Sequence, residues 1–254
     1  MKLQLLSKGT EGKVTFLAKD TTPAKLNLFR RMLVNKVPSM ATDTVEIIEN
    51  SSALYDEMLA HRLGLLVLKT DFDACFLNNK NKYQVQLSLE AQGPCTVYAE
   101  QLVSTDPGIY PVHGKTPIVK LLENQELKII CNATTGCGKE HIKFSPGLIF
   151  YKGYPTLNLK DAAAIKLAEA LLKSSPTDAE LVKNKAVKNI DTFELSMAGV
   201  GALEKEGLIT ISKTDFIVTI EPWGQLTAQE IIEGAGKVID EQFDELVEEI
   251  KKIK

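Results

Sequence analysis

The sequence is poor in cysteine, histidine and long apolar runs. Its 254 residues include four cysteines, three histidines and one tryptophan. So few cysteines do not suggest a disulfide scaffold. No stretch approaches the roughly 18 apolar residues that a membrane helix needs, and the apolar run near the N-terminus is too short for a secretory signal. We therefore expect a soluble, cytoplasmic protein that does not contact a membrane.

The chain also lacks an excess of positive charge. Its formal net charge is −3 at pH 7, and 44% of its residues are hydrophobic. This balance argues against binding nucleic acid over a broad basic face, although a local basic patch remains compatible with it. The length suits one large domain or two to three small ones with a sizeable core.

Motifs of known enzyme classes are missing as well. The segment GCGKEH superficially resembles a phosphate-binding loop, but the pattern would need Gly at position 133 and Ser or Thr at 140. The chain has Ala133 and Glu140 instead. Neither a G-x-S-x-G elbow nor an H-E-x-x-H motif is present. The sequence therefore contains none of these catalytic motifs.

One metal site is conceivable, built from Cys131, Cys137 and His141. Zinc sites usually contain C-x-x-C pairs, and the sequence has none. The other interpretation is that these thiols are buried or free, because Cys131 falls in a strand pattern where a small hydrophobic residue fits. The first interpretation would make the chain a stand-alone metal-binding protein or enzyme.

The most informative stretch is residues 21–68. Thr22-Pro23 predicts the start of a helix, and Leu28, Phe29, Met32 and Leu33 fall on one face of it. The proline at position 38 ends that helix, because a residue before proline avoids helical backbone angles. A half-buried strand then contains residues 45–47, and Ser52 is predicted to cap a second helix with an apolar stripe at positions 54, 58 and 65.

The remaining chain predicts an α+β fold. We expect a hairpin over residues 1–20, a loop over 71–82 and a mostly β block over 83–151, in which Leu127, Ile129, Cys131 and Ala133 alternate with polar positions. Residues 152–215 predict short helices, one of them ending at Gly207, and a hairpin around residues 212–214.

The last 28 residues predict one long helix. Thr227 and Glu230 form a capping box, and apolar residues then recur every three or four positions from 232 to 253. Gly234 and Gly236 lie inside this helix, which suggests the close approach of another backbone. A long helix with one apolar stripe needs a partner surface in this chain or in another one.

Two pairs of polar residues have alternative interpretations. Arg30 and Arg31 are either a solvated helix face or a recognition site for a carboxylate-bearing partner, which the arginine fork suits. Glu57 and His61 lie four residues apart on one helix face. They are either an acid–base pair or a side-chain pair at an interface.

Several segments closely resemble the alpha-like subunit of archaeal RNA polymerase, the family designated D, which is related to the bacterial alpha subunit. The run NLFRRMLVNKVPSMATDTVEIIENSSALYDEMLAHRLGLLVL carries the match most densely. It is supported by VYAEQLVSTDPGIYPVHGKTPIVKLLENQELKI, GKEHIKFSPG and FIVTIEPWGQLTAQEIIEGAGKVIDEQFDEL. Together these segments cover most of the chain outside residues 152–214.

The resemblance implies a discontinuous alpha-like dimerisation domain with an inserted mostly β domain. The dimerisation domain would comprise residues 1–40, 146–155 and 215–254, and the inserted domain residues 41–145. Residues 156–214 would form a reduced, ferredoxin-like α/β insert. The implied role is a non-catalytic assembly subunit, in a complex whose large subunits carry the nucleotidyltransferase chemistry and the contact with DNA.

The resemblance also implies partners. Subunit L would form a heterodimer with the chain, on which the small subunits N and P and the second-largest subunit assemble. The expected dimer contacts are Leu28, Phe29, Met32, Leu33, Ile232, Ala235, Ile239, Phe243 and Leu246. The expected contacts with the other subunits are Asn27, Arg30, Arg31, Glu57, His61, Arg62, Lys139, Glu140 and His141. A homodimeric scaffold, like bacterial alpha, is the remaining alternative.

The sequence departs from the family in its cysteines. Many members hold an iron–sulfur cluster in the third region, but residues 152–214 contain no cysteine here. Because clusters need thiolate ligands, we expect none in this chain. Some members bind zinc after the position of Asp71, where this chain offers only Cys75. We therefore expect no cofactor.

Overall fold

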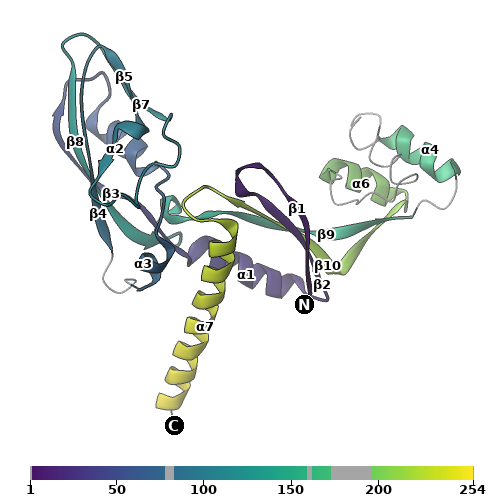
Figure 1. Ribbon diagram of the computed structural model, residues 1–254. Helices are drawn as coiled ribbons and strands as arrows, with labels where there is room; N and C mark the ends of the chain where they lie inside the picture. Colours follow the sequence, from purple (N-terminus) through teal and green to yellow (C-terminus); the bar gives the residue numbers. More distant parts are fainter. Residues whose placement is uncertain (1, 78–82, 159–161, 173–195, 254) are drawn as a thin grey trace. The chain divides into compact units, whose positions relative to one another are not determined.

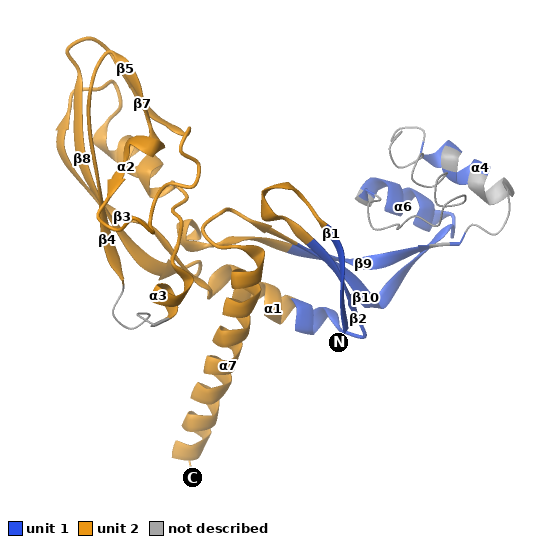
Figure 2. Ribbon diagram, viewed as in Figure 1, with its two compact units in different colours: residues 1–7, 15–26, 150–219 blue, residues 8–14, 27–149, 220–254 orange. Residues whose placement is uncertain are grey.

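The computed structural model describes residues 2–77, 83–158, 162–172 and 196–253. It is a mixed α+β structure, shown in Figure 1. The chain divides into two compact units, which Figure 2 distinguishes by colour: residues 1–7, 15–26 and 150–219, and residues 8–14, 27–149 and 220–254. In the parts that the structure describes, no helix is long and apolar enough to cross a membrane.

A four-stranded sheet with the order β1-β2-β10-β9 dominates the first unit. Its strands are β1 (Lys2–Lys8), β2 (Val14–Lys19), β9 (Gly147–Leu157) and β10 (Ile209–Pro222). The predicted N-terminal hairpin is therefore confirmed. The predicted hairpin around residues 212–214 is wrong, because β10 runs through these residues as one strand.

Among the described residues of the first unit, β9 is followed by helices α4 (Ala162–Leu171) and α6 (Met197–Lys205). Ala168, Leu172, Val200 and Leu203 bury their side chains together in a small core of their own. Gly207 adopts a positive φ of 68°, so the predicted C-terminal glycine after α6 is confirmed. One of the short helices predicted within residues 152–215, which would begin near residue 177, lies outside the described residues.

The main sheet of the second unit has the order β3-β8-β4-β6. It contains β3 (Pro38–Asn50), β4 (Gln84–Gln92), β6 (Val103–Ser104) and β8 (Glu126–Cys137), and β3 and β4 both pair antiparallel with β8. A two-stranded sheet of β5 (Cys95–Tyr98) and β7 (Pro117–Leu121) accompanies it. The alternation predicted for β8 is confirmed: Leu127, Ile129, Cys131 and Ala133 are all buried in the core.

Helix α2 (Asp56–Gly64) buries a different face from the predicted one. Leu59 and Leu63 are fully buried, whereas Met58 is 53% exposed and Leu65, just beyond the helix, is 49% exposed. Ser52 does not cap this helix either. Its hydroxyl donates to the side chain of Asn50, and Tyr55 stands at the N-cap without a side-chain hydrogen bond.

The residues after Asp71 form a short helix, α3 (Phe72–Leu77), instead of the predicted exposed loop. Phe72 and Cys75 are buried. Helices α1 (Pro23–Asn35) and α7 (Ala228–Lys252) match their predictions, including the capping box of Thr227 and Glu230. Short 3-10 turns, η1 (Thr10–Gly12), η2 (Ala99–Gln101) and η3 (Ile142–Phe144), complete the described elements.

Ile129 and Ile130, which are adjacent in β8, test which face of this strand is buried. We expect Ile129→Ala to lower the free energy of unfolding by about 2–5 kcal/mol, because Ile129 is 1% exposed and its loss leaves a cavity. Ile130→Ala should cost clearly less, because Ile130 is only half-buried and lies on the other face of the strand. Urea denaturation of both variants provides the measurement. Equal losses would contradict the register.

Candidate partner-binding surfaces

Helix α7 carries two apolar stripes with different surroundings. Ile231, Gly234, Ala235 and Val238 are buried within the second unit. Five residues along the C-terminal part of the helix are instead exposed to solvent by 47–84%: Phe243, Leu246, Val247, Ile250 and Ile253. The second stripe therefore has no cover in the part of the chain that the structure describes.

The buried stripe of α7 packs against α3. Gly234 faces the rings of Phe72 and Phe76, and a Cβ at this position would lie 3.1 Å from each ring. The Lys237 ammonium lies 4.5 Å from the centroid of Phe72 and 5.5 Å from that of Phe76. The expected close approach at Gly234 is thus made by aromatic side chains and not by a backbone. At Gly236, no described atom other than those of its chain neighbours and of its own helix backbone lies within 4 Å of where a Cβ would stand, so no described element makes a close approach there.

A groove lies where the exposed stripe of α7 faces α1. Leu28, Ile239, Gln242, Phe243 and Leu246 line this groove of roughly 180 Å³. Four of these five residues belong to the predicted dimer contacts. Phe29, Met32 and Ile232 are half-buried. Leu33 and Ala235 are fully buried and do not line the groove.

The predicted arginine pair on α1 is split by its local contacts. Arg30 donates from Nε and Nη2 to Asn27 Oδ1, at 3.3 and 2.9 Å, which holds its guanidinium along the helix. Arg31 is exposed, whereas Asn27 and Arg30 are half-buried. The structure therefore pairs Arg30 with Asn27 and presents Arg31 to solvent.

The exposed face of α2 carries three of the predicted contacts, Glu57, His61 and Arg62. Arg62 donates from Nη2 to the Pro117 carbonyl at 2.6 Å, which fixes its guanidinium against β7. Tyr55, Met58 and Leu65, in and beside this helix, are exposed by 77%, 53% and 49%.

The turn after β8 presents Lys139, Glu140 and His141, all of them exposed. Two contacts hold this turn against α1. The Lys139 amide donates to the Asn35 carbonyl at 2.9 Å, and Gly138 lies so close to the Val34 carbonyl that no larger residue fits. Ser39 Oγ donates to the Phe144 carbonyl at 2.7 Å, which fixes η3 to β3.

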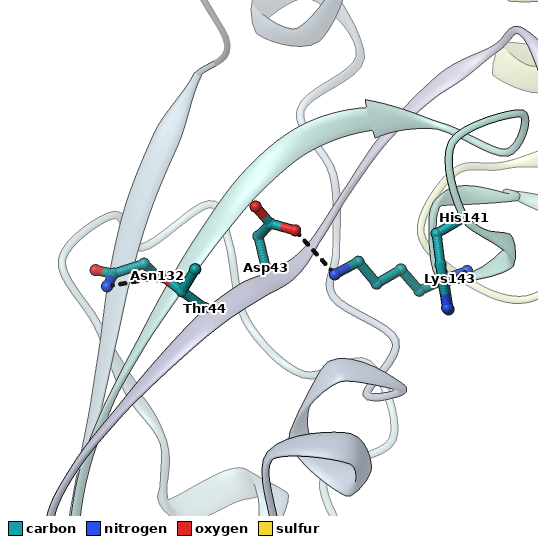
Figure 3. A network of polar contacts seen from close by, with 5 residues as sticks. All are labelled: Asp43, Thr44, Asn132, His141 and Lys143. Atoms are coloured by element: carbon teal, nitrogen blue, oxygen red, sulfur yellow. Dashed lines mark hydrogen bonds and ion pairs between the residues drawn. The ribbon is translucent and has the colours of Figure 1, made fainter. Parts of the chain in front are cut away.

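A polar pocket brings together two of the predicted histidines. His61 from α2 and His141 from the turn line it, together with Asp43 and Lys143, which the sequence does not single out. Lys143 Nζ forms an ion pair with Asp43 Oδ1 at 3.0 Å (Figure 3). The Lys143 amide donates to His141 Nδ1 at 3.1 Å. The sequence does not predict this pairing, because Asp43 lies at an irregularity in the pairing of β3.

The conceivable metal ligands are not arranged as a site. Cys131 is 1% exposed in the core, and burial raises the pKa of its thiol to about 12. A thiol with that pKa stays protonated near neutral pH and is a poor metal ligand. Cys137 Sγ donates to the Lys36 carbonyl at 3.4 Å, and His141 lies on the exposed turn. Across the described ranges, no three His, Cys, Asp or Glu side chains are grouped to hold a metal ion.

The comparisons with known proteins agree along the whole chain. Residues 36–149 match a family described as the RNA polymerase Rpb3/RpoA insert domain. A protein of Pyrococcus horikoshii named DNA-directed RNA polymerase subunit Rpo3 is 34% identical over 257 residues, covering 100% of this chain and 99% of its own length. The chain belongs to the Rpo3 family.

Two other Rpo3 proteins show the same relationship. That of Pyrococcus furiosus is 35% identical, covering 100% of this chain and 98% of its own length. That of Thermococcus kodakarensis is 34% identical with 94% coverage of both chains. Rpo3 is the archaeal alpha-like subunit that the sequence resembles, so both this resemblance and the α+β fold class with an inserted domain are confirmed.

The two glycines of α7 provide a matched test of its packing. We expect Gly234→Val to destabilise the protein by about 1–3 kcal/mol, because the new side chain collides with Phe72 and Phe76. Gly236→Val should be neutral or stabilising, because its surroundings are open and valine has the higher helix propensity. Thermal unfolding followed by circular dichroism compares them. A Gly234 variant as stable as the Gly236 variant would contradict the α3–α7 packing.

Proposed function

We propose that the chain is a non-catalytic assembly subunit of a multisubunit DNA-directed RNA polymerase. Its membership of the Rpo3 family carries this proposal. The nucleotidyltransferase chemistry would belong to the large subunits, and the chain would meet DNA only through the complex. It would act in the cytoplasm and hold no metal or iron–sulfur cluster.

The α1–α7 groove is the proposed binding site for subunit L. The supporting observation is the spacing of residues 239, 243, 246, 250 and 253, which alternates between four and three. This spacing is the repeat of a helix that packs along another helix. Because Phe243, Leu246 and Ile250 are each more than half exposed, burying them against a partner removes a large apolar area from water.

Only part of the predicted contact set would touch subunit L itself. Leu28, Ile239, Phe243 and Leu246 line the groove, and the half-buried residues Phe29, Met32 and Ile232 would lie at its edges. Leu33 and Ala235 are fully buried, so they would not touch subunit L directly.

Three polar sites are the proposed contacts with the small subunits N and P and with the second-largest subunit. They are the α1 site of Asn27, Arg30 and Arg31, the α2 site of Glu57, His61 and Arg62, and the turn of Lys139, Glu140 and His141. Their support is that all three occur in segments that resemble the archaeal alpha-like family, and that Arg30 and Arg62 are already held in fixed positions by hydrogen bonds. Fixed side chains lose less entropy on binding.

The domain limits remain part of the proposal. A dimerisation domain of residues 1–40, 146–155 and 215–254 would carry the groove, and residues 41–145 would form the inserted domain. The family match over residues 36–149 and the separate β3-β8-β4-β6 sheet support this division. Residues 156–214 would be the reduced ferredoxin-like insert, supported by the small separate core of α4 and α6.

Co-purification with subunit L tests the dimer proposal. We expect Phe243→Asp to reduce recovery of the complex by at least about tenfold, because the carboxylate would lose its water in the apolar α1–α7 groove. Phe243 is 56% exposed, so the isolated variant should keep its fold and its melting temperature. The result is read by affinity capture and native mass measurement.

Two controls sharpen this experiment. Phe243→Leu keeps the α1–α7 groove apolar, so this variant should still form the complex. Glu248→Lys changes a charge on roughly the opposite side of α7 and should also retain it. If Phe243→Asp binds subunit L normally, or if the wild-type chain forms a homodimer that ignores subunit L, the proposal fails.

A further inference from the structure

The pocket between α2, β3 and the turn after β8 is built around a β-bulge. Thr42 pairs with Ala133 and Thr44 pairs with the next residue of β8, Asn132, so Asp43 is an extra residue in β3. A bulge bends its strand and turns a side chain away from the regular pattern. Here it directs Asp43 to Lys143, whose side chain is only 14% exposed (Figure 3).

Neighbouring contacts keep the bulge in place. Asn132 Nδ2 donates to Thr44 Oγ1 at 3.3 Å and to Glu46 Oε1 at 3.2 Å, which holds β3 and β8 together beyond the bulge. The Lys143 ammonium also lies 5.1 Å from the centroid of the Phe144 ring. The ion pair is thus anchored on both sides and neutralises the Asp43 carboxylate.

His141 has a defined direction in this pocket. Because its Nδ1 accepts a hydrogen bond from the Lys143 amide, the neutral ring carries its proton on Nε2. The ring therefore offers a hydrogen-bond donor on the side away from η3. His61 adds a second imidazole from α2, and the remaining protons of Lys143 are further donors.

The size of the pocket restricts its occupant. Its volume is about 160 Å³, below the roughly 300–1,000 Å³ of pockets that hold small-molecule ligands. It suits one side chain of a protein partner. Because Asp43 is already paired, the groups left for a partner are imidazole and ammonium donors, so the complementary side chain is an acceptor. A carboxylate makes the strongest hydrogen bonds to such donors.

Exposed apolar residues flank this polar centre. Leu65, which also lines the pocket, is 49% exposed, and Ile142, between His141 and Lys143 in sequence, is 65% exposed. An apolar surface around a polar pocket is the arrangement of protein interfaces, in which surrounding contacts exclude water from the central pair.

We propose that this pocket receives an aspartate or glutamate side chain of a polymerase subunit other than the one bound at the α1–α7 groove. The pocket and the groove share no lining residue, so the two partners would contact different residues of the chain. The inference rests on the proposed function, since it needs the assembled polymerase. It adds the chemistry of the contact and the identity of its central residues.

The third histidine of the chain supplies a matched control for the test. The double variant His61→Ala/His141→Ala should pair with subunit L as the wild type does, but join the remaining polymerase subunits with at least about tenfold lower affinity. His113→Ala, which removes an exposed imidazole that contacts the Trp223 carbonyl elsewhere, should assemble normally. Reconstitution from purified subunits, followed by native mass spectrometry, measures both steps.

A photo-crosslinking residue in place of Leu65 identifies the occupant. In the assembled polymerase it should attach to another subunit within a few residues of an aspartate or glutamate. Changing that acidic residue to its amide should reproduce the assembly defect, without a further loss in the His61→Ala/His141→Ala background.

The outcomes separate this inference from the proposed function. If the wild-type chain does not pair with subunit L, the proposed function fails. If the pairing is normal but the double-histidine variant assembles like the wild type, the pocket inference alone is wrong. A crosslink to subunit L, or to a segment without an acidic residue, also overturns the pocket inference.

Discussion

Helix α7 carries two apolar stripes, and the described part of the chain covers only one of them. Helix α7 uses one stripe, centred on Gly234 and Val238, to pack against its own unit. This contact fixes the direction of the helix and leaves the stripe of Phe243 and Leu246 exposed. Exposed apolar area of this extent is unfavourable in water, so the second stripe favours a partner surface. The proposed assembly role thus begins with the geometry of one helix.

The same packing explains why some predicted contacts are internal. Periodicity groups Leu33 and Ala235 with residues that face the groove, because a repeat of three and four residues cannot distinguish adjacent sides of a wide apolar face. In the structure both are fully buried, while Leu28 and Leu246 face outward. Which residues of such a face are buried and which are exposed depends on the elements packed around the helix. The spacing of residues in the sequence does not contain that information.

Elements with strong local signals are predictable. The capping box of α7, the alternation along β8 and the glycine after α6 each depend on neighbouring residues alone. The errors occur where tertiary contacts override local preference. Residues 72–77 look polar and turn-rich, but the burial of Phe72 and Cys75 allows them to form α3. β10 passes as one strand through a stretch whose residues favour a turn, because it pairs on both sides in the sheet.

The polar pocket contains residues that could be predicted from the sequence and one that could not. His61 and His141 are recognisable as candidates because they lie in segments that resemble the archaeal alpha-like family, although 80 positions separate them in sequence. Asp43 is not, because its orientation depends on a one-residue irregularity between β3 and β8. That irregularity changes the chemistry of the pocket: it supplies the carboxylate that pairs with Lys143. With its one carboxylate already paired, the pocket leaves its remaining donors for the proposed acidic side chain.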